Sequence, residues 1–296
     1  MGVDRRALEA LLYLSRHHNF DRTAMIGRHG MPLKPRTLKR IFGLHGYQLT
    51  EEDTRIICST RYAEPLLEYL GATSVDSVDA SDYQDANLIA DLSKPVPSEW
   101  LGRFDTVIDA GTIEHIYNFP QAVENCLGML KPGGFYMCLT CGNSYSGHGF
   151  YQISPELWFS LFSSNHFADI EVFLVPTRPE PPWFKVADPH AIKGRVEVIN
   201  GEQTFVLAFA RKTDRTPRSL VQPQQSDYEQ LLWKGEAAIP RVKRSWSVQL
   251  ARGLRSLLGN TVKFFGRRAV PAFGLSDHPH LEAFDPAADK PPHRYS

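Results

Sequence analysis

Asp79, Asp91 and Asp109 each directly follow a short apolar run of the chain, which is the pattern of a buried strand followed by a polar turn. In an open parallel sheet, ligands bind beyond the carboxyl ends of the strands. A carboxylate at the end of one strand can accept hydrogen bonds from both hydroxyls of a ribose, and a carboxylate after the next strand can accept one from an exocyclic amine. Asp79 and Asp91 therefore outline an adenosine site. Each aspartate taken alone has a second interpretation, because aspartates also start turns and cap helices.

The elements that must position these residues alternate along the chain. Apolar runs predict strands over 75–78, 86–90, 104–108, 135–139, 170–175 and 204–210. Helical periodicity predicts helices over 3–16, 34–42, 62–71, 120–130 and 155–162, with Gly133 and Gly134 ending the fourth. Strands that alternate with helices predict an α/β fold with a doubly wound, mostly parallel sheet, in which the last two strands form an antiparallel edge pair.

Several segments resemble class I S-adenosylmethionine-dependent methyltransferases. FDTVIDAGTIEHIYNFPQAVENCLGMLKPGGFYM resembles the fourth strand, the following helix and the fifth strand of that family, while VDSVDAS and LIADLSKPVP resemble its ribose-binding and adenine-binding stretches. The likeness covers about residues 20–212. A bacterial group of methyltransferase-like proteins is similar to this chain in four segments together, AMIGRHG, VDASDY, AGTIEH and GHGFYQISPE. The likeness implies a Rossmann-like domain and S-adenosylmethionine as cofactor. The family's ribose-binding and adenine-binding acids match Asp79 and Asp91. Further cofactor-binding candidates are Leu92, Gly111, Asp109 and Glu114, the last two because carboxylates attract the positive sulfonium.

The glycine-rich loop that follows the first strand in that family, D-x-G-x-G-x-G, is missing here. Two segments compete for the first strand, AMIGRHG and RIICSTRYAEP. We prefer AMIGRHG, because Gly27 and Gly30 permit a close approach to the backbone. Arg28 would then pair with the carboxylate of the cofactor. The alternative is that Gly27 to Gly30 form a turn between helices.

Three further side chains are candidates for the chemistry of methyl transfer. A hydroxyl acceptor benefits from a base near its proton, typically a histidine or a carboxylate. His115 follows Glu114 after the fourth strand, and His148 and Tyr151 lie in SGHGFYQ after the fifth. We expect His115 or His148 to act as the base. In the alternative, these side chains hold their loops by hydrogen bonds.

Composition narrows the class of protein. The formal net charge is zero, with 33 basic and 33 acidic residues, so no nucleic-acid partner is expected. Four cysteines are too few for a disulfide framework, and with no signal peptide they predict a cytoplasmic protein. Cys138 and Cys141 form a C-x-x-C, but on a strand they point to opposite faces and no second pair exists, so no metal site is predicted.

The chain divides into three predicted parts: an N-terminal helical extension (1–20), a methyltransferase-like domain (21–212) and a C-terminal extension (213–296). Between Arg241 and Arg268 the extension has eight basic residues and no acidic one, with apolar residues at helical spacing. This helix would contact an anionic membrane surface or a protein, or pack on the domain.

The leading hypothesis is methyl transfer to a small-molecule or carbohydrate-type acceptor. A carbohydrate is included only because similar bacterial proteins look like companions of glycan-modifying enzymes. The second is a non-catalytic methyltransferase-like binding module, motivated by the missing glycine loop. The third is a nucleotide-sugar or nicotinamide enzyme on a related sheet, against which the absence of G-x-G-x-x-G counts.

Overall fold

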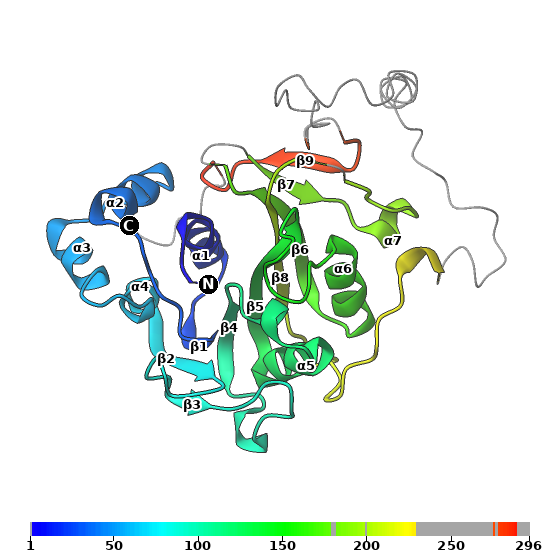
Figure 1. Cartoon of the computed structure of the whole chain (residues 1–296), viewed down its shortest axis with the longest axis horizontal. Helices are drawn as coiled ribbons and strands as arrows, with labels where there is room; N and C mark the ends of the chain where they lie inside the picture. Colours follow the sequence, from blue (N-terminus) through cyan, green and yellow to red (C-terminus); the bar gives the residue numbers. More distant parts are fainter. Residues whose placement is uncertain (1, 179–181, 199, 229–274, 276–277, 289–296) are drawn as a thin grey trace.

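A computed structural model describes residues 2–178, 182–198, 200–228, 275 and 278–288 (Figure 1). The helices are α1 (Arg5–His17), α2 (Pro35–Leu44), α3 (Glu51–Ile57), α4 (Glu64–Tyr69), α5 (Phe119–Met129), α6 (Pro155–Ser164) and α7 (Pro189–Ile192), with short 3₁₀ helices η1 (Ser98–Trp100) and η2 (Ile113–His115). The strands are β1 (Asp21–Ile26), β2 (Ala72–Asp79), β3 (Leu88–Ile89), β4 (Phe104–Asp109), β5 (Leu130–Asn143), β6 (Ala168–Pro176), β7 (Trp183–Val186), β8 (Thr204–Arg211) and β9 (Leu281–Phe284).

These strands form one sheet in the order β3-β2-β1-β4-β5-β8-β6-β7-β9. From β3 to β5 all neighbours are parallel. The order 3-2-1-4-5 is that of a doubly wound sheet, in which the direction of winding changes between β1 and β4. The predicted fold class is therefore confirmed. The preferred segment AMIGRHG contributes the end of β1, the middle strand of the parallel half. Residues 55–57 of the competing segment lie in α3.

The other half of the sheet is antiparallel. β8 lies between β5 and β6 and pairs antiparallel with both, so the pairing of the two late strands is as predicted. β7 then pairs with β6, and β9 with β7, both antiparallel. Neither of these strands was predicted, and β9 shows that the sheet continues beyond residue 212.

Helices cover both faces of the sheet (Figure 1). On one face, apolar side chains of α1 and α4 join those of the strands in one core, and α2 packs on α1. On the other face, α5 and α6 bury leucine and phenylalanine side chains in a second core. Side chains of strand β5 point alternately into the two layers. Cys138 packs in one layer and Cys141 in the other, as predicted from their spacing. The site is thus built on a sheet buried on both faces.

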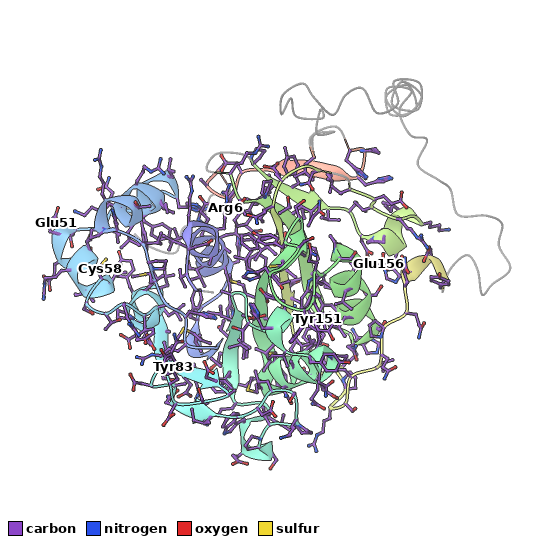
Figure 2. All side chains as sticks on the ribbon, viewed as in Figure 1. Arg6, Glu51, Cys58, Tyr83, Tyr151 and Glu156 are labelled. Carbon is purple, nitrogen blue, oxygen red and sulfur yellow. The ribbon has the colours of Figure 1, made fainter. Side chains whose placement is uncertain are left out.

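Side chains of helix α1 pack in the same core as those of the sheet. Asp4 caps its N-terminus by accepting a 2.9 Å hydrogen bond from the amide of Ala7. Leu8, at 0% exposure, packs in the core. The buried guanidinium of Arg6 donates to the carbonyl of Pro176 at the end of β6, 3.0 Å away (Figure 2). The boundaries of the three predicted parts themselves stay a prediction.

Two local expectations need correction. The helix predicted over 120–130 ends at Met129, and Gly133 and Gly134 lie inside β5 instead of ending the helix. The strand predicted over 86–90 is reduced to β3, only two residues long. The predicted basic helix over 241–268 lies outside the described residues. In the part of the chain that is described, no helix is both long and apolar enough to cross a membrane.

Candidate functional site

The loops that follow β1 and β4 meet where the winding direction changes. The hydroxyl of Thr112, just after β4, donates a 2.6 Å hydrogen bond to the carbonyl of Ile26, the last residue of β1. Gly27 has φ of +77° and Gly111 of +91°, the left-handed region that favours glycine. A Cβ on Gly27 would lie 2.8 Å from the Thr112 hydroxyl, so the close approach at this glycine is made by the protein's own side chain.

His29 lies at the switch point, the place between β1 and β4 where the winding direction of the sheet changes. Its sequence context did not mark it as a site residue. Its Nε2 atom lies 2.9 Å from the carbonyl oxygen of Ile26 and 3.4 Å from the amide of Ala110. Burial lowers the pKa of His29 to about 4 and so keeps the ring neutral. Its buried Nδ1 atom has no hydrogen-bond partner among the described residues.

Arg28, predicted to pair with a cofactor carboxylate, is engaged by the protein. Its Nε donates to a carboxylate oxygen of Glu64, 2.6 Å away, and a terminal nitrogen donates to the carbonyl of Gln84 at 2.8 Å. The guanidinium also lies 4.0 Å from the centroid of the Tyr62 ring. These contacts fix Arg28 beside α4.

The two candidate nucleoside-binding aspartates differ in their surroundings. Asp79, half-buried at the end of β2, uses one carboxylate oxygen to accept from the amide of Ala80 at 2.7 Å. Asp91 starts a turn in which the hydroxyl and amide of Ser93 donate to it and Lys94 lies 3.1 Å away. These hydrogen bonds, Ser93 first, lower the pKa of Asp91. Its bonds with Ser93 are those of an aspartate that starts a turn, and Leu92 beside it packs in the core.

Asp109, at the end of β4, is completely buried. It accepts hydrogen bonds from the amide of Thr112 at 2.8 Å and from the thiol of Cys138 at 3.4 Å. Burial, and then the negative charge of Glu114, raise the pKa of Asp109 to about 7. A positive group placed nearby would lower this pKa again, so Asp109 is suited to respond to a cation.

Glu114, on η2, is a second completely buried carboxylate. It accepts a 3.0 Å hydrogen bond from the hydroxyl of Thr140, and the thiol of Cys141 lies 3.7 Å away. Its backbone carbonyl accepts from the amides of Phe150 and Tyr151, at 2.8 and 3.3 Å. The loop between β5 and α6 is thereby folded onto η2.

This loop brings the three catalytic candidates together. The rings of His115 and His148 are in edge contact, with centroids 4.9 Å apart. The Nε2 atom of His148 lies 3.9 Å from a carboxylate oxygen of Glu114. Tyr151, labelled in Figure 2, donates through its hydroxyl to the carbonyl of Tyr117 at 2.6 Å. The tyrosine hydroxyl fastens the loop, whereas the histidines lie at the loop surface.

Two adjoining cavities open beyond the carboxyl end of β5. The larger, about 220 Å³, has both apolar and amide walls; the amides come from Asn143, Gln152 and Asn200. Asn143 donates to Asn200, which donates to the hydroxyl of Thr204 at 2.6 Å. The smaller cavity, about 150 Å³, shares Ser154, Pro155 and Val196 with it.

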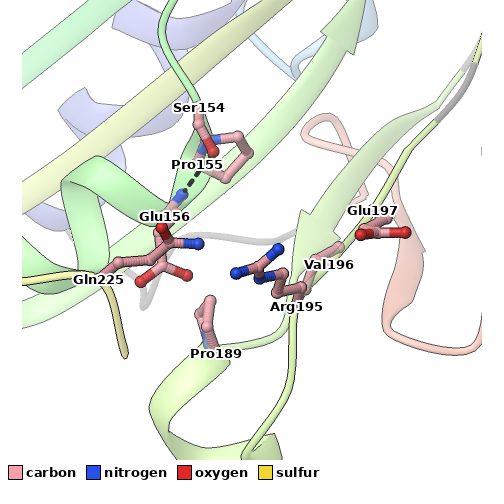
Figure 3. Close-up of a pocket in the computed structure, with 8 residues that line it drawn as sticks. All are labelled: Ser154, Pro155, Glu156, Pro189, Arg195, Val196, Glu197 and Gln225. Atoms are coloured by element: carbon pink, nitrogen blue, oxygen red, sulfur yellow. Dashed lines mark hydrogen bonds between the residues drawn. The ribbon is translucent and has the colours of Figure 1, made fainter. Parts of the chain in front are cut away.

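The smaller cavity has charged walls. Glu156 and Gln225 face Arg195 across it (Figure 3). Both charges have partners: Arg195 binds the buried Asp227 at 2.5 Å, and Glu156 accepts from the amide of Ser226 at 2.8 Å. The amides of the larger cavity also have partners, since Gln152 accepts from the amide of Tyr145 at 2.9 Å, but none of them is charged.

Comparison with known proteins gives a distant likeness. No family model matches the chain, and no curated protein matches its sequence. A putative methyltransferase from Bacillus halodurans is 13% identical over 69% of this chain and 98% of its own, with a TM-score of 0.39. A possible histamine N-methyltransferase from Thermotoga maritima is 14% identical over 71% and 91%, with a TM-score of 0.36.

A third similar structure holds ligands. The 1,6-didemethyltoxoflavin-N1-methyltransferase of Burkholderia thailandensis, with 1,6-didemethyltoxoflavin and S-adenosylhomocysteine bound, is 13% identical over 71% of this chain and 78% of its own, with a TM-score of 0.37. At such values the likeness says nothing about the chemistry of this chain, which has to be argued from its own residues.

Proposed function

We propose that the protein is a methyltransferase that uses S-adenosylmethionine and acts on a small acceptor with hydroxyl groups, such as a carbohydrate. The observation that carries the proposal is the position of Asp79. It ends β2, next to the point where the winding of the sheet changes between β1 and β4, which is where doubly wound sheets bind ligands. One of its carboxylate oxygens has no partner among the described residues and is available to a ribose.

The residues fit the nucleoside end of the cofactor better than its amino-acid end. Asp79 would hold the ribose, and Asp91 and Leu92 would lie beside the adenine. Asp109 and Glu114 place two buried carboxyl groups close to the switch point, where a sulfonium would lower the raised pKa of Asp109 and favour its charged form. Arg28 would reach the amino-acid end only after leaving Glu64, and Thr112 already contacts Gly27.

Methyl transfer from a sulfonium is an in-line displacement, in which the bound cofactor supplies an electrophilic methyl group. The chain contributes orientation, which can remove roughly 7–11 kcal/mol of the barrier. A hydroxyl acceptor also loses a proton, and His148 or His115 would accept it at a ring nitrogen. Glu114 lies near enough to stabilise the resulting imidazolium of His148.

The amide-lined cavity supports the choice of acceptor. Carboxamides donate and accept hydrogen bonds without charge, so they suit neutral hydroxyl groups. Its volume of about 220 Å³ is suited to a small molecule or one sugar unit of a larger one. Apolar walls from Ile153, Leu174 and Val206 would cover the carbon face of such a ring.

A second candidate function, a binding module without catalysis, is favoured by the loop after β1. There the protein's own groups, Thr112 against Gly27 and Glu64 on Arg28, already make the contacts that a cofactor would make. In this case Asp79 would be dispensable.

The two functions are separated by calorimetric titration of the full chain with S-adenosylmethionine, S-adenosylhomocysteine and NAD. The proposal expects micromolar binding of the first two, loss of that binding in Asp79→Ala, and unchanged binding in Asp82→Ala, whose exposed carboxylate lies three residues further along. Absence of binding to the folded wild-type protein would overturn it in favour of the binding module. Binding by Asp79→Ala equal to wild type would remove the assigned ribose contact.

A further inference from the structure

The Glu114 carboxylate accepts hydrogen bonds from the Thr140 hydroxyl and the Cys141 thiol, but these neutral donors do not balance its charge. The Glu114 carboxylate is completely buried, yet within the described ranges no lysine or arginine is found in ion-pair contact with it. Its basic neighbours are His148 and His115. The Nε2 atom of His148 is shielded from solvent and has no hydrogen-bond partner among the described residues. A buried carboxylate is costly unless it is paired or coordinates a metal.

The separation of these groups suits a bridging ion. The two atoms are 3.9 Å apart, too far for a hydrogen bond. Two ligand atoms of one tetrahedral zinc ion lie about 3.4 Å apart, so a bound ion would draw these two groups together by about half an ångström. His115 adds a third donor, and the ligand atoms of Glu114, His115 and His148 all lie within 4.8 Å of one another.

The surroundings hold the carboxylate in place. Thr140 donates to the Glu114 oxygen Oε2, at 3.0 Å, while His148 lies next to Oε1. A hydrogen bond to one oxygen of a ligating carboxylate orients the other toward a metal. The fold of the loop onto the Glu114 carbonyl fixes His148 relative to η2. Gly149 is required there, because a Cβ on it would lie 2.9 Å from that carbonyl oxygen.

The geometry points to a binding site for a divalent transition-metal ion formed by Glu114, His115 and His148. Two imidazoles and one carboxylate suit zinc, iron(II), cobalt or manganese, whereas magnesium and calcium prefer oxygen ligands throughout. Three protein ligands leave a coordination position open, as in catalytic zinc sites. If the proposed function holds, that position would bind an acceptor oxygen, and the ligating ring nitrogens would no longer serve as bases. Metal binding itself does not depend on that function.

The test is titration of the tag-free, chelator-treated full chain with zinc chloride followed by calorimetry, and with cobalt(II) followed by visible absorption. We expect one equivalent of zinc to bind with micromolar or tighter affinity, and cobalt to give ligand-field bands of a nitrogen- and oxygen-ligated ion. His115→Asn and His148→Asn should each weaken zinc binding at least tenfold. His166→Asn, which removes an exposed histidine outside the site, should bind like wild type.

Thermal unfolding of each variant without metal shows whether it is folded, which matters most for the buried Glu114→Gln. No zinc binding by the wild-type chain, or equal binding by wild type and both site variants, would overturn the proposal. S-adenosylmethionine affinity is measured separately on the metal-free protein. Failure of the cofactor site and failure of the metal site are therefore distinguishable.

Discussion

The Thr112 hydroxyl and the Ile26 carbonyl are joined by a 2.6 Å hydrogen bond that links the carboxyl ends of β4 and β1. The same hydroxyl lies against Gly27, which has a φ of +77°. This bond connects the loops after β1 and β4, from which the chain winds in opposite directions across the sheet. Any ligand bound at this switch point would rest on this pair of loops, so their rigidity sets the shape of the site.

Gly27→Ala is expected to lower the free energy of unfolding by more than the cost of placing alanine in a left-handed conformation. A left-handed conformation costs a residue with a Cβ about 1–2 kcal/mol. At Gly27 the new methyl would also lie 2.8 Å from the Thr112 hydroxyl. Gly46→Ala is the matched control, because its φ is +81° and no atom lies within 4 Å of the added Cβ. Urea denaturation measures both, and equal losses would show that Thr112 imposes no constraint on Gly27.

Helix α1 is expected to be required for folding of the whole domain. Leu8→Ala removes a fully buried side chain and should cost about 2–5 kcal/mol in the free energy of unfolding. Leu44→Ala, at a leucine of α2 that is 54% exposed, should change it by less than about 0.5 kcal/mol. A chain that begins at residue 21 should lack a cooperative unfolding transition. Cooperative unfolding of that shortened chain would instead make α1 a separate extension.

The sequence predicts the parallel half of the sheet well because its interior strands are buried on both faces and form continuous apolar runs. β7 and β9 were not predicted, since each is short and one follows a proline-rich stretch while the other stands apart in a polar segment. Residues 55–57 were an open alternative for the first strand, although the sequence contains the helix signal. Thr50 and Asp53 form a capping box at the start of α3, and this spacing outweighs the short apolar run.

The site was predictable only in part, because its contacts join distant segments. The strand-end position of Asp79 follows from the apolar run before it. The pairing of Glu114 with His148 depends on how the loop after β5 folds back over η2, which no local pattern specifies. His29 was missed for the same reason: a single histidine gives no periodic signal, and its burial results from the junction of β1 and β4.

His18 is expected to make the protein less stable in acid. Burial lowers the pKa of His18 to about 4, against the ordinary 6.5. Between these values the unfolded chain binds a proton that the folded chain does not, so stability is full above about 6.5 and is lost as pH falls toward 4. At pH 5 this one group should contribute a slope of about 1 kcal/mol per pH unit to the free energy of unfolding.

The comparison of wild type with His18→Gln isolates this contribution. The Nε2 atom of His18 is 2.9 Å from the hydroxyl of Thr106, and glutamine preserves a hydrogen-bonding group in that direction. Urea denaturation of both proteins at several pH values between 4.5 and 7 gives the two slopes. The variant should lose stability less steeply than wild type, and parallel curves would mean that His18 has the same pKa in the folded and unfolded chains.

Gly149→Ala is expected to weaken zinc binding although residue 149 provides no ligand. Its φ is +67°, and a Cβ would press on the Glu114 carbonyl, moving the loop that carries His148 away from the carboxylate. Gly147→Ala has a comparable backbone cost, with φ of +91°, but no atom lies within 4 Å of the added Cβ. Because ligand distances in a metal site tolerate only a few tenths of an ångström, the Gly149 variant should bind zinc at least tenfold more weakly than the Gly147 variant. Equal zinc affinities in calorimetry, for two folded variants, would mean that the contact of Gly149 with Glu114 does not position His148.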